Sequence, residues 1–162
     1  MKQIHRSNNG FTLIELLVTV AIVGVMASVV LPMMELVVQR GKEQELRTAL
    51  REIRVALDAY HAAVLEGRIL HSPTVSGYPP NLGILVEGVE DARSPSAKSR
   101  IYFIRRIPRD PFSLDREVSA EKQWGLRSYA SSAETPDAGE DIYDVYSHSA
   151  GVGINGIAYR DW

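Results

Sequence analysis

The hydrophobic and polar positions divide the chain into a long apolar stretch and a mixed remainder. The stretch from Phe11 to Met34 has 24 residues, and Glu15 is the only ionisable residue among them. As a helix it would be about 36 Å long, which is enough to cross a hydrocarbon core of about 30 Å. The pattern therefore predicts a membrane-spanning helix over residues 11–34.

A second, amphipathic pattern follows directly. Its apolar residues are spaced alternately four and three positions apart, at Leu46, Leu50, Ile53, Leu57, Tyr60 and Val64. This spacing places them on one side of a helix, which we expect to continue over 35–67 and to end at Gly67. The stripe either packs against the chain's own sheet or forms a coiled-coil seam, and its shortness favours the first interpretation.

Pro32 lies inside the predicted helix. Proline removes a backbone hydrogen bond and kinks a helix. Two interpretations stay open at this point. The residue marks either a site where the helix bends or melts as subunits pack, or a kink where the membrane gives way to water.

The remaining residues, 68–162, predict a globular domain. We expect a short helix over 81–89 with Asn81 as its cap, and an apolar β-prone segment over 101–107. Strands are expected at 126–131, 142–147 and 156–160, with a hairpin turn over 134–140. The whole pattern predicts an α+β fold, in which a long N-terminal helix packs on a small C-terminal antiparallel β-sheet.

Composition and charge exclude several classes of function. The net charge of the 162 residues is −2, which gives no sign of a nucleic-acid binder, and the absence of cysteine excludes disulfides and thiol catalysis. The four histidines lack metal-ligand spacing. Ser147 and His148 near Asp144 form no triad, because neighbouring strand residues point to opposite faces. The sequence therefore predicts no enzyme.

The residues before the apolar stretch suggest an orientation in the membrane. Lys2 and Arg6 precede it and no acid does, so the positive-inside tendency places Met1 in the cytoplasm and the domain outside. A cleaved secretory signal is a competing interpretation, but its apolar core is usually about 7–15 residues long and gains nothing from an acid. A plain one-pass anchor is the stronger alternative.

Glu15 lies one helical turn after Phe11. A charge at the middle of the bilayer costs about 2.5–3.5 kcal/mol, whereas a glutamate near the membrane face is tolerated. If the chain is cut between Gly10 and Phe11, the new amino group of one subunit would neutralise Glu15 of a neighbouring helix. Such a pair would determine the stagger between adjacent subunits.

The segment Gly10-Phe11-Thr12-Leu13-Ile14-Glu15 resembles the prepilin cleavage and methylation motif of type IV pilins and type II secretion pseudopilins. The resemblance implies that residues 1–10 are a leader peptide, and that a prepilin peptidase cuts after Gly10 and methylates the amine of Phe11. It also implies that Glu15 acts in assembly. Pro32 matches a proline that is common in the family's first helix.

Later landmarks resemble the major, G-type pseudopilin of type II secretion. They are, in chain order, Tyr78-Pro79, residues 82–86, 106–112, 124–129 and 141–147, and Trp162. The absence of cysteine favours this branch, because type IV major pilins often close their C-terminal region with a disulfide. Residues 113–123 depart from the family's pattern and look like an insertion.

The resemblance implies a structural subunit of a helical filament. The chain would lie in the inner membrane with a cytoplasmic N-terminus and a periplasmic domain, and would then join a pseudopilus that drives export of folded periplasmic proteins. The implied partners are copies of itself, a prepilin peptidase, an inner-membrane assembly platform and minor pseudopilins. The alternatives are a type IV pilus major or minor pilin, used in adhesion, motility or DNA uptake, and a monomeric anchored binding domain.

The resemblance also implies a calcium ion in the last loop. In residues 147–162 the only carboxylate side chain is Asp161, whereas calcium prefers about six to eight oxygen ligands, usually with more than one acid. Asp141, Asp144 and Asn155 are the other candidate ligands. The sequence therefore disfavours a calcium site but leaves these four residues as its candidates, and it indicates no other cofactor.

Overall fold

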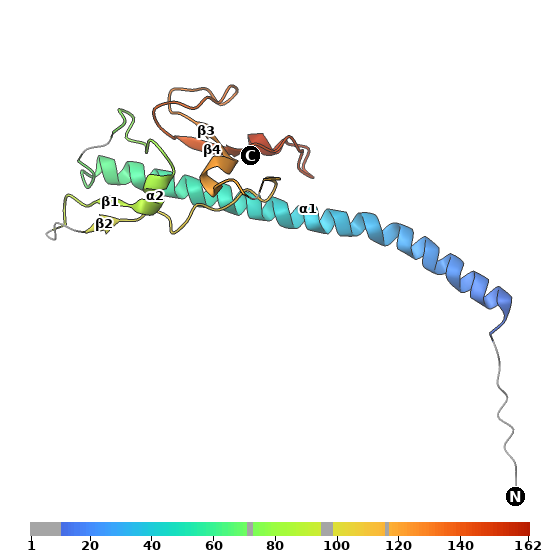
Figure 1. Cartoon of the computed structure of the whole chain (residues 1–162). Helices are drawn as coiled ribbons and strands as arrows, with labels where there is room; N and C mark the ends of the chain where they lie inside the picture. The colour runs from blue at the N-terminus through green and yellow to red at the C-terminus, as the bar shows by residue number, and fades with distance from the viewer. Residues whose placement is uncertain (1–10, 71–72, 95–98, 116) are drawn as a thin grey trace, which may run out of the picture. The chain divides into compact units, whose positions relative to one another are not determined.

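The computed structural model describes residues 11–70, 73–94, 99–115 and 117–162, with the side chains of all of them except 29–32. The predicted leader, residues 1–10, lies outside this part of the chain. Figure 1 draws the helices and strands in chain order. The chain divides into two units, Met1–Gln39 and Arg40–Trp162, whereas the sequence pattern placed the end of the apolar stretch at Met34.

The longest element is α1, a helix of 53 residues from Leu13 to Leu65 (Figure 1). The backbone of Pro32 is part of it. The predicted continuation of the helix beyond the apolar stretch is therefore confirmed. A functional bend or melting point at Pro32 stays a prediction.

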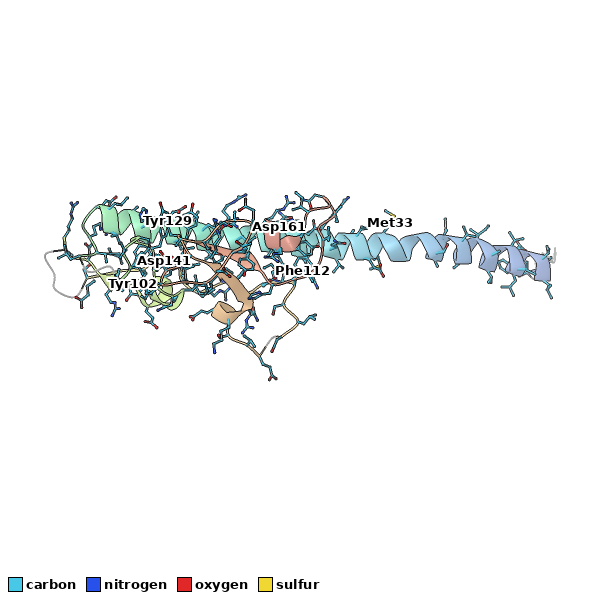
Figure 2. The ribbon with its side chains drawn as sticks, turned by 90° about the horizontal axis from the view of Figure 1, so that it is seen from above. Met33, Tyr102, Phe112, Tyr129, Asp141 and Asp161 are labelled. Atoms are coloured by element: carbon cyan, nitrogen blue, oxygen red, sulfur yellow. The ribbon has the colours of Figure 1, made fainter. Side chains whose placement is uncertain are left out.

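In the first unit, the large apolar side chains of α1 are exposed. Leu13 is 81% exposed and Met33, which is labelled in Figure 2, is 61% exposed. Among the described residues, α1 is the one helix that is long and apolar enough to cross a membrane, and none of its most apolar window is buried within the protein. Contiguous apolar surface of this extent marks a membrane or protein contact.

The second unit has a hydrophobic core that is built on the rest of α1. Leu46, Ile53 and Leu57 are fully buried, and Leu50 and Tyr60 nearly so. Further along the chain, the buried residues that complete this core include Leu82, Leu85, Ile104, Ile107, Trp124, Ile142, Val145 and Tyr159. The stripe therefore packs against the chain's own domain, as predicted, and its interpretation as a coiled-coil seam is not needed.

The end of α1 has the geometry that the sequence predicted. Gly67 has a φ of +67°, the left-handed conformation that glycine adopts at low cost. The N–H of Gly67 donates to the carbonyl of Val64 at 2.9 Å, and the N–H of Arg68 donates to that of Ala63 at 2.9 Å. This pair of bonds is a Schellman motif, which satisfies the last carbonyls of the helix.

The region after α1 contains a short helix, α2 (Gly83–Glu87), whose N-cap position is Leu82 and not the predicted Asn81, although the Asn81 side chain still bonds to its first turn. The side-chain oxygen of Asn81 accepts the N–H of Ile84 at 3.0 Å. This helix is shorter than the predicted 81–89, because the chain then enters β1 (Val89–Glu90), which pairs antiparallel with β2 (Arg100–Ile101).

The sequence pattern did not predict the pairing of β1 with β2, and it placed a longer strand over 101–107. That strand is wrong beyond Ile101. The N–H groups of Phe103 and Ile104 both donate to the carbonyl of Leu85 in α2. These backbone groups are therefore unable to continue a ladder with another strand.

The predicted hairpin is present as β3 (Trp124–Arg127) and β4 (Asp144–Ser147), which pair antiparallel with Trp124 opposite Ser147. A 3₁₀ helix, η1 (Ala120–Gln123), precedes β3. The predicted strand over 126–131 starts too late and extends too far, because the N–H of Ser128 donates to the carbonyl of Asp137 in the loop. The two faces of β4 differ, since Val145 and Ser147 are buried while Asp144 and Tyr146 are partly exposed.

The predicted third strand, over 156–160, is wrong. Val152 and Ala158 form only an isolated bridge, and the chain continues into a 3₁₀ helix, η2 (Tyr159–Asp161). Gly156, with a φ of +79°, turns the backbone just before this point. The described residues thus contain two two-stranded sheets in place of one sheet, and the α+β class is confirmed.

Candidate assembly site

The first turn of α1 carries a reciprocal pair of hydrogen bonds. The N–H of Glu15 donates to the hydroxyl of Thr12 at 3.3 Å, and the N–H of Thr12 donates to Oε2 of Glu15 at 3.5 Å. This arrangement is a capping box, in which two otherwise unsatisfied donors of a helix start find side-chain acceptors. A carboxylate in the first turn also interacts favourably with the helix dipole.

The reasoning from sequence missed Thr12. It assigned Glu15 to a contact between subunits and gave the preceding threonine no role. The signal was present, because a threonine followed three residues later by a glutamate, just before an apolar run, is typical of a capping box. Glu15 therefore has a local role in starting the helix, whatever else it contacts.

Two hydroxyl side chains in the apolar part of α1 are satisfied within the helix. Thr19 donates to the carbonyl of Leu16 at 2.8 Å, and Ser28 donates to the carbonyl of Val25 at 2.7 Å. Hydrocarbon offers no partner for a polar group, so each such group must bond within its own segment. The hydroxyl groups of Thr19 and Ser28 can therefore lie in lipid without losing their hydrogen bonds.

The predicted processing residues lie at or beyond the start of the described chain. Gly10 is outside the described residues. Phe11 is exposed at the start of the described chain, and Glu15 is exposed one turn further on. Glu15 lies next to Thr12, and none of the ion pairs among the described residues includes it, so a basic partner for this carboxylate would have to come from another molecule or from outside the described residues.

The calcium candidate Asp144 is bound by arginines. Its Oδ1 accepts the Nε–H of Arg54 at 2.7 Å, and its Oδ2 accepts from Arg127 at 3.3 Å. A cavity of about 360 Å³ that Asp144 and Asp161 both line is also lined by Arg54, Arg127 and Arg160. Three cationic groups oppose the binding of a divalent cation there.

The other three candidates have hydrogen-bond or charged neighbours of their own. Oδ1 of buried Asp141 accepts the N–H of Tyr129 at 2.9 Å, and both residues are labelled in Figure 2. Oδ1 of Asn155 accepts the N–H of Ile157 at 3.1 Å, and Asp161 is exposed beside Arg160. In the part of the chain that the structure describes, no three His, Cys, Asp or Glu side chains are placed to hold a metal.

Ser147 and His148, which were considered as members of a catalytic triad, contact other side chains of the domain. Ser147 is fully buried and donates its hydroxyl hydrogen to Oδ2 of Asp110 at 2.5 Å. The other carboxylate oxygen of Asp110 accepts the N–H of Phe112 at 2.8 Å. His148 is exposed and lies edge-on to Tyr146. The bond between Ser147 and Asp110 holds β4 to the segment that precedes η1, which is a structural role.

The apparent insertion, 113–123, is an ordered loop around one aspartate over its described part. Oδ1 of Asp115 accepts the N–H groups of Glu117 and Val118, and its carbonyl accepts from the side chain of Gln123 at 2.8 Å. The adjoining Leu114 is fully exposed. The described part of the loop is therefore held mainly by its own hydrogen bonds.

Comparisons with known proteins agree with this architecture. Residues 5–31 match the family model of the prokaryotic N-terminal methylation motif. The type II secretion system core protein G of Klebsiella pneumoniae is 30% identical over 139 residues, which cover 82% of this chain and 91% of the relative. The proteins of the same name from Dickeya chrysanthemi and Aeromonas hydrophila are 26% and 27% identical, over 85% and 84% of this chain and 86% and 90% of their own lengths. No solved structure is significantly similar to the chain.

Proposed function

Because the chain belongs to the core protein G family of type II secretion systems, we propose that it is a structural subunit of a secretion pseudopilus. The observation that carries the proposal is the exposed apolar part of α1, over residues 13–28 and 33–38. In a monomer this surface requires lipid, and in a filament the same surface would pack against the helices of neighbouring copies. One segment thus serves both states.

The family membership supports an order of events. The subunit is anchored in the inner membrane by α1, with its N-terminus in the cytoplasm and residues 40–162 in the periplasm. A prepilin peptidase removes the leader after Gly10 and methylates the amine of Phe11. An assembly platform and minor pseudopilins then start a filament, whose growth pushes folded periplasmic proteins toward the outer membrane.

Glu15 is the residue that would determine the register of the filament. It is the only ionisable residue between Phe11 and Met34, and a charge without a partner in an apolar bundle is strongly unfavourable. Cleavage after Gly10 creates a positive amine on Phe11. When this amine of one copy lies beside Glu15 of the next, both charges are compensated. One stagger between adjacent helices is therefore favoured over all other staggers.

The capping contact leaves Glu15 able to change partners. The bond from the N–H of Thr12 to Oε2 of Glu15 is 3.5 Å long, which is at the weak end of the range for a hydrogen bond. An ionic bond to an amine in a water-poor bundle would be shorter and stronger. The carboxylate therefore starts the helix in the monomer and would pair with the neighbouring amine on assembly.

The two alternatives fit the observations less well. The relatives are named as secretion proteins, which does not favour a type IV pilin of adhesion, motility or DNA uptake. A monomeric anchored binding domain would account for the apolar helix but not for the match of residues 5–31 to the N-terminal methylation motif. It also predicts that the mature chain keeps its leader.

The test is the mass of the N-terminal peptide of the protein isolated from its own cells. We expect a peptide that begins at Phe11 and carries one added methyl group on its amine. A peptide that still begins at Met1 would contradict the proposal and favour the anchored monomer. Tandem fragmentation places the methyl group, since a methyl on Lys42 or another side chain would not support it.

A further inference from the structure

The last residues of the chain, 151–162, lie against charged residues of α1. Glu43, Arg47 and Arg54 are spaced four and seven positions apart, so they share one side of the helix. All three contact residues between Ile154 and Trp162, more than a hundred positions further along the chain. They form what we call the α1 clamp.

Glu43 is the buried member of the α1 clamp. Only 7% of it is exposed, and its Oε1 accepts the N–H of Ile154 at 2.8 Å and the hydroxyl of Tyr159 at 3.1 Å. Hydrogen bonds to an ionised acceptor are roughly twice as strong as bonds between neutral groups. The carboxylate thus binds the loop through one backbone donor and one side-chain donor.

The two arginines hold the end of the segment. The guanidinium of Arg47 lies over the indole ring of Trp162 at 4.3 Å from its centre. Arg54 donates from Nη2 to the main-chain oxygen of Trp162 at 2.9 Å, while its Nε binds Asp144 at 2.7 Å. Arg54 therefore ties the last residue to β4 and to α1 together.

The segment also satisfies its own backbone groups. The N–H of Gly153 donates to the carbonyl of Ile157 at 2.8 Å, and the N–H of Tyr159 donates to that of Gly151 at 3.1 Å. The indole N–H of Trp162 donates to the carbonyl of Ile157 at 3.2 Å. The carbonyls of Gly151 and Ile157 thus accept hydrogen bonds from donors of the segment itself.

We propose that the α1 clamp holds residues 151–162 in place of the calcium ion that the family resemblance implies, so that their folded conformation needs no divalent cation. Asp144 is already paired with two arginines, and arginines line both cavities that the candidates Asp144, Asn155 and Asp161 line. The anion that organises the loop is Glu43, which bonds directly to the loop's donors with no cation between them. This inference concerns the subunit itself and does not depend on filament formation.

The test is hydrogen exchange of the full chain in detergent micelles, measured by mass spectrometry on the peptide that contains Ile154. We expect the same exchange rate, within about twofold, in excess calcium and in excess EDTA. In Glu43→Ala the rate should rise about tenfold or more, and equally with or without calcium. Glu45→Ala is the matched control, because this glutamate is exposed one half-turn away on the same helix and should leave the rate unchanged.

Two results would overturn the inference. One is a tenfold faster exchange of the segment when calcium is removed from the unmodified chain. The other is a Glu43→Ala rate that equals the Glu45→Ala rate. If Glu43→Ala fails to fold, Glu43→Gln replaces it, because glutamine keeps an acceptor oxygen without the charge. The inference then requires that the exchange rate of the segment in Glu43→Gln lies between the rates of the unmodified chain and the unfolded chain. EDTA should again leave this rate unchanged.

Discussion

At the scale of the residue, an ion pair joins the end of α1 to the turn after β1. Nη2 of Arg68 lies 2.7 Å from Oδ2 of Asp91, and the carbonyl of Arg68 accepts the N–H of Ala92. The hydrogen bond from Arg68 lowers the pKa of Asp91 below its ordinary value, with help from the N–H of Arg93 and against a smaller opposing effect of desolvation. The same bond raises the pKa of Arg68.

This pair predicts a dependence of stability on pH. Because the pKa of Asp91 is lower in the folded state, its stabilisation is present above the unfolded value of 3.8 and is lost as the pH falls through the folded value. Asp91→Asn should therefore lower the urea midpoint of the full chain in micelles at neutral pH. The deficit should disappear at a pH below both pKa values.

Asp137→Asn is the control for this experiment, because the same chemical change is made at an exposed loop position. It should leave the urea midpoint unchanged at both pH values. If Asp91→Asn shows the same deficit in acid as at neutral pH, the stabilisation comes from the shape of the side chain and not from its charge.

At the scale of the element, the end of α1 depends on backbone conformation more than on side-chain contacts. A Cβ built on Gly67 would meet no atom within 4 Å, so there is space for a larger residue. Its φ of +67°, however, is a conformation in which other residues are strained. Gly41 lies within α1, also with nothing within 4 Å, but in ordinary helical conformation.

The two glycines therefore predict opposite effects of the same substitution. Gly67→Ala should destabilise the protein by about 1–2 kcal/mol, since the left-handed conformation costs this much for a residue with a Cβ. Gly41→Ala should stabilise it by about 0.5–1 kcal/mol through its higher helix propensity. Urea unfolding of both variants in micelles measures the two values, and a change of the same sign in both would contradict the conformational argument.

At the scale of the whole molecule, the two units differ in where their apolar side chains lie. Among the residues that the structure describes, every buried hydrophobic side chain lies between Leu46 and Tyr159, in the second unit. The apolar side chains that the structure describes in the first unit are exposed, and none of them is part of the hydrophobic core. The first unit is therefore free to exchange lipid for the helices of other copies while the core of the second unit stays intact.

Assembly should then depend on the charge of Glu15. Glu15→Gln keeps a capping box, since glutamine also serves at this position, but it removes the charge that would pair with the amine of Phe11. We expect a processed protein that stays in the membrane and forms at least about tenfold fewer crosslinked multimers, equivalent to about 1.4 kcal/mol per contact. Electron microscopy of filaments and crosslinking in native cells measure this.

Glu35→Gln is the matched control, because this glutamate is exposed on the same helix outside the apolar stretch, and it should assemble normally. Filaments of normal number and length from Glu15→Gln would refute the pairing of Glu15 with the amine. They would leave the membership of the protein family untouched.

The local pattern of apolar and polar residues was sufficient to predict much of the fold. The apolar length of residues 11–34, the stripe from Leu46 to Val64 and the glycine stop of α1 depend on contacts within a few turns, so periodicity and composition predicted them. The pairing of β3 with β4 was also predictable, because the segment that connects them, residues 128–143, contains the turn residues Pro136 and Gly139. The capping role of Thr12 was equally local and was overlooked.

Contacts between distant parts of the chain could not be predicted in the same way. The apolar segment at 101–107 has the composition of a strand, yet its backbone donors bond to Leu85 of α2. Residues 156–160 also resemble a strand, yet the turn at Gly156 and the contacts of Tyr159 lead them into η2. In both segments the local structure depends on which hydrogen-bond partners the rest of the fold brings close to the backbone.

By itself, the sequence determined that this protein has an apolar helix with one acid at its start, an amphipathic continuation and a small α+β domain, because these features follow from periodicity along a single element. Only the tertiary structure decided that Glu43 and Arg54 of α1 would hold the last residues of the chain, and that Asp144 would bind arginines. These contacts join positions about 90 or more residues apart. Such partners become neighbours only once the core has brought the elements together.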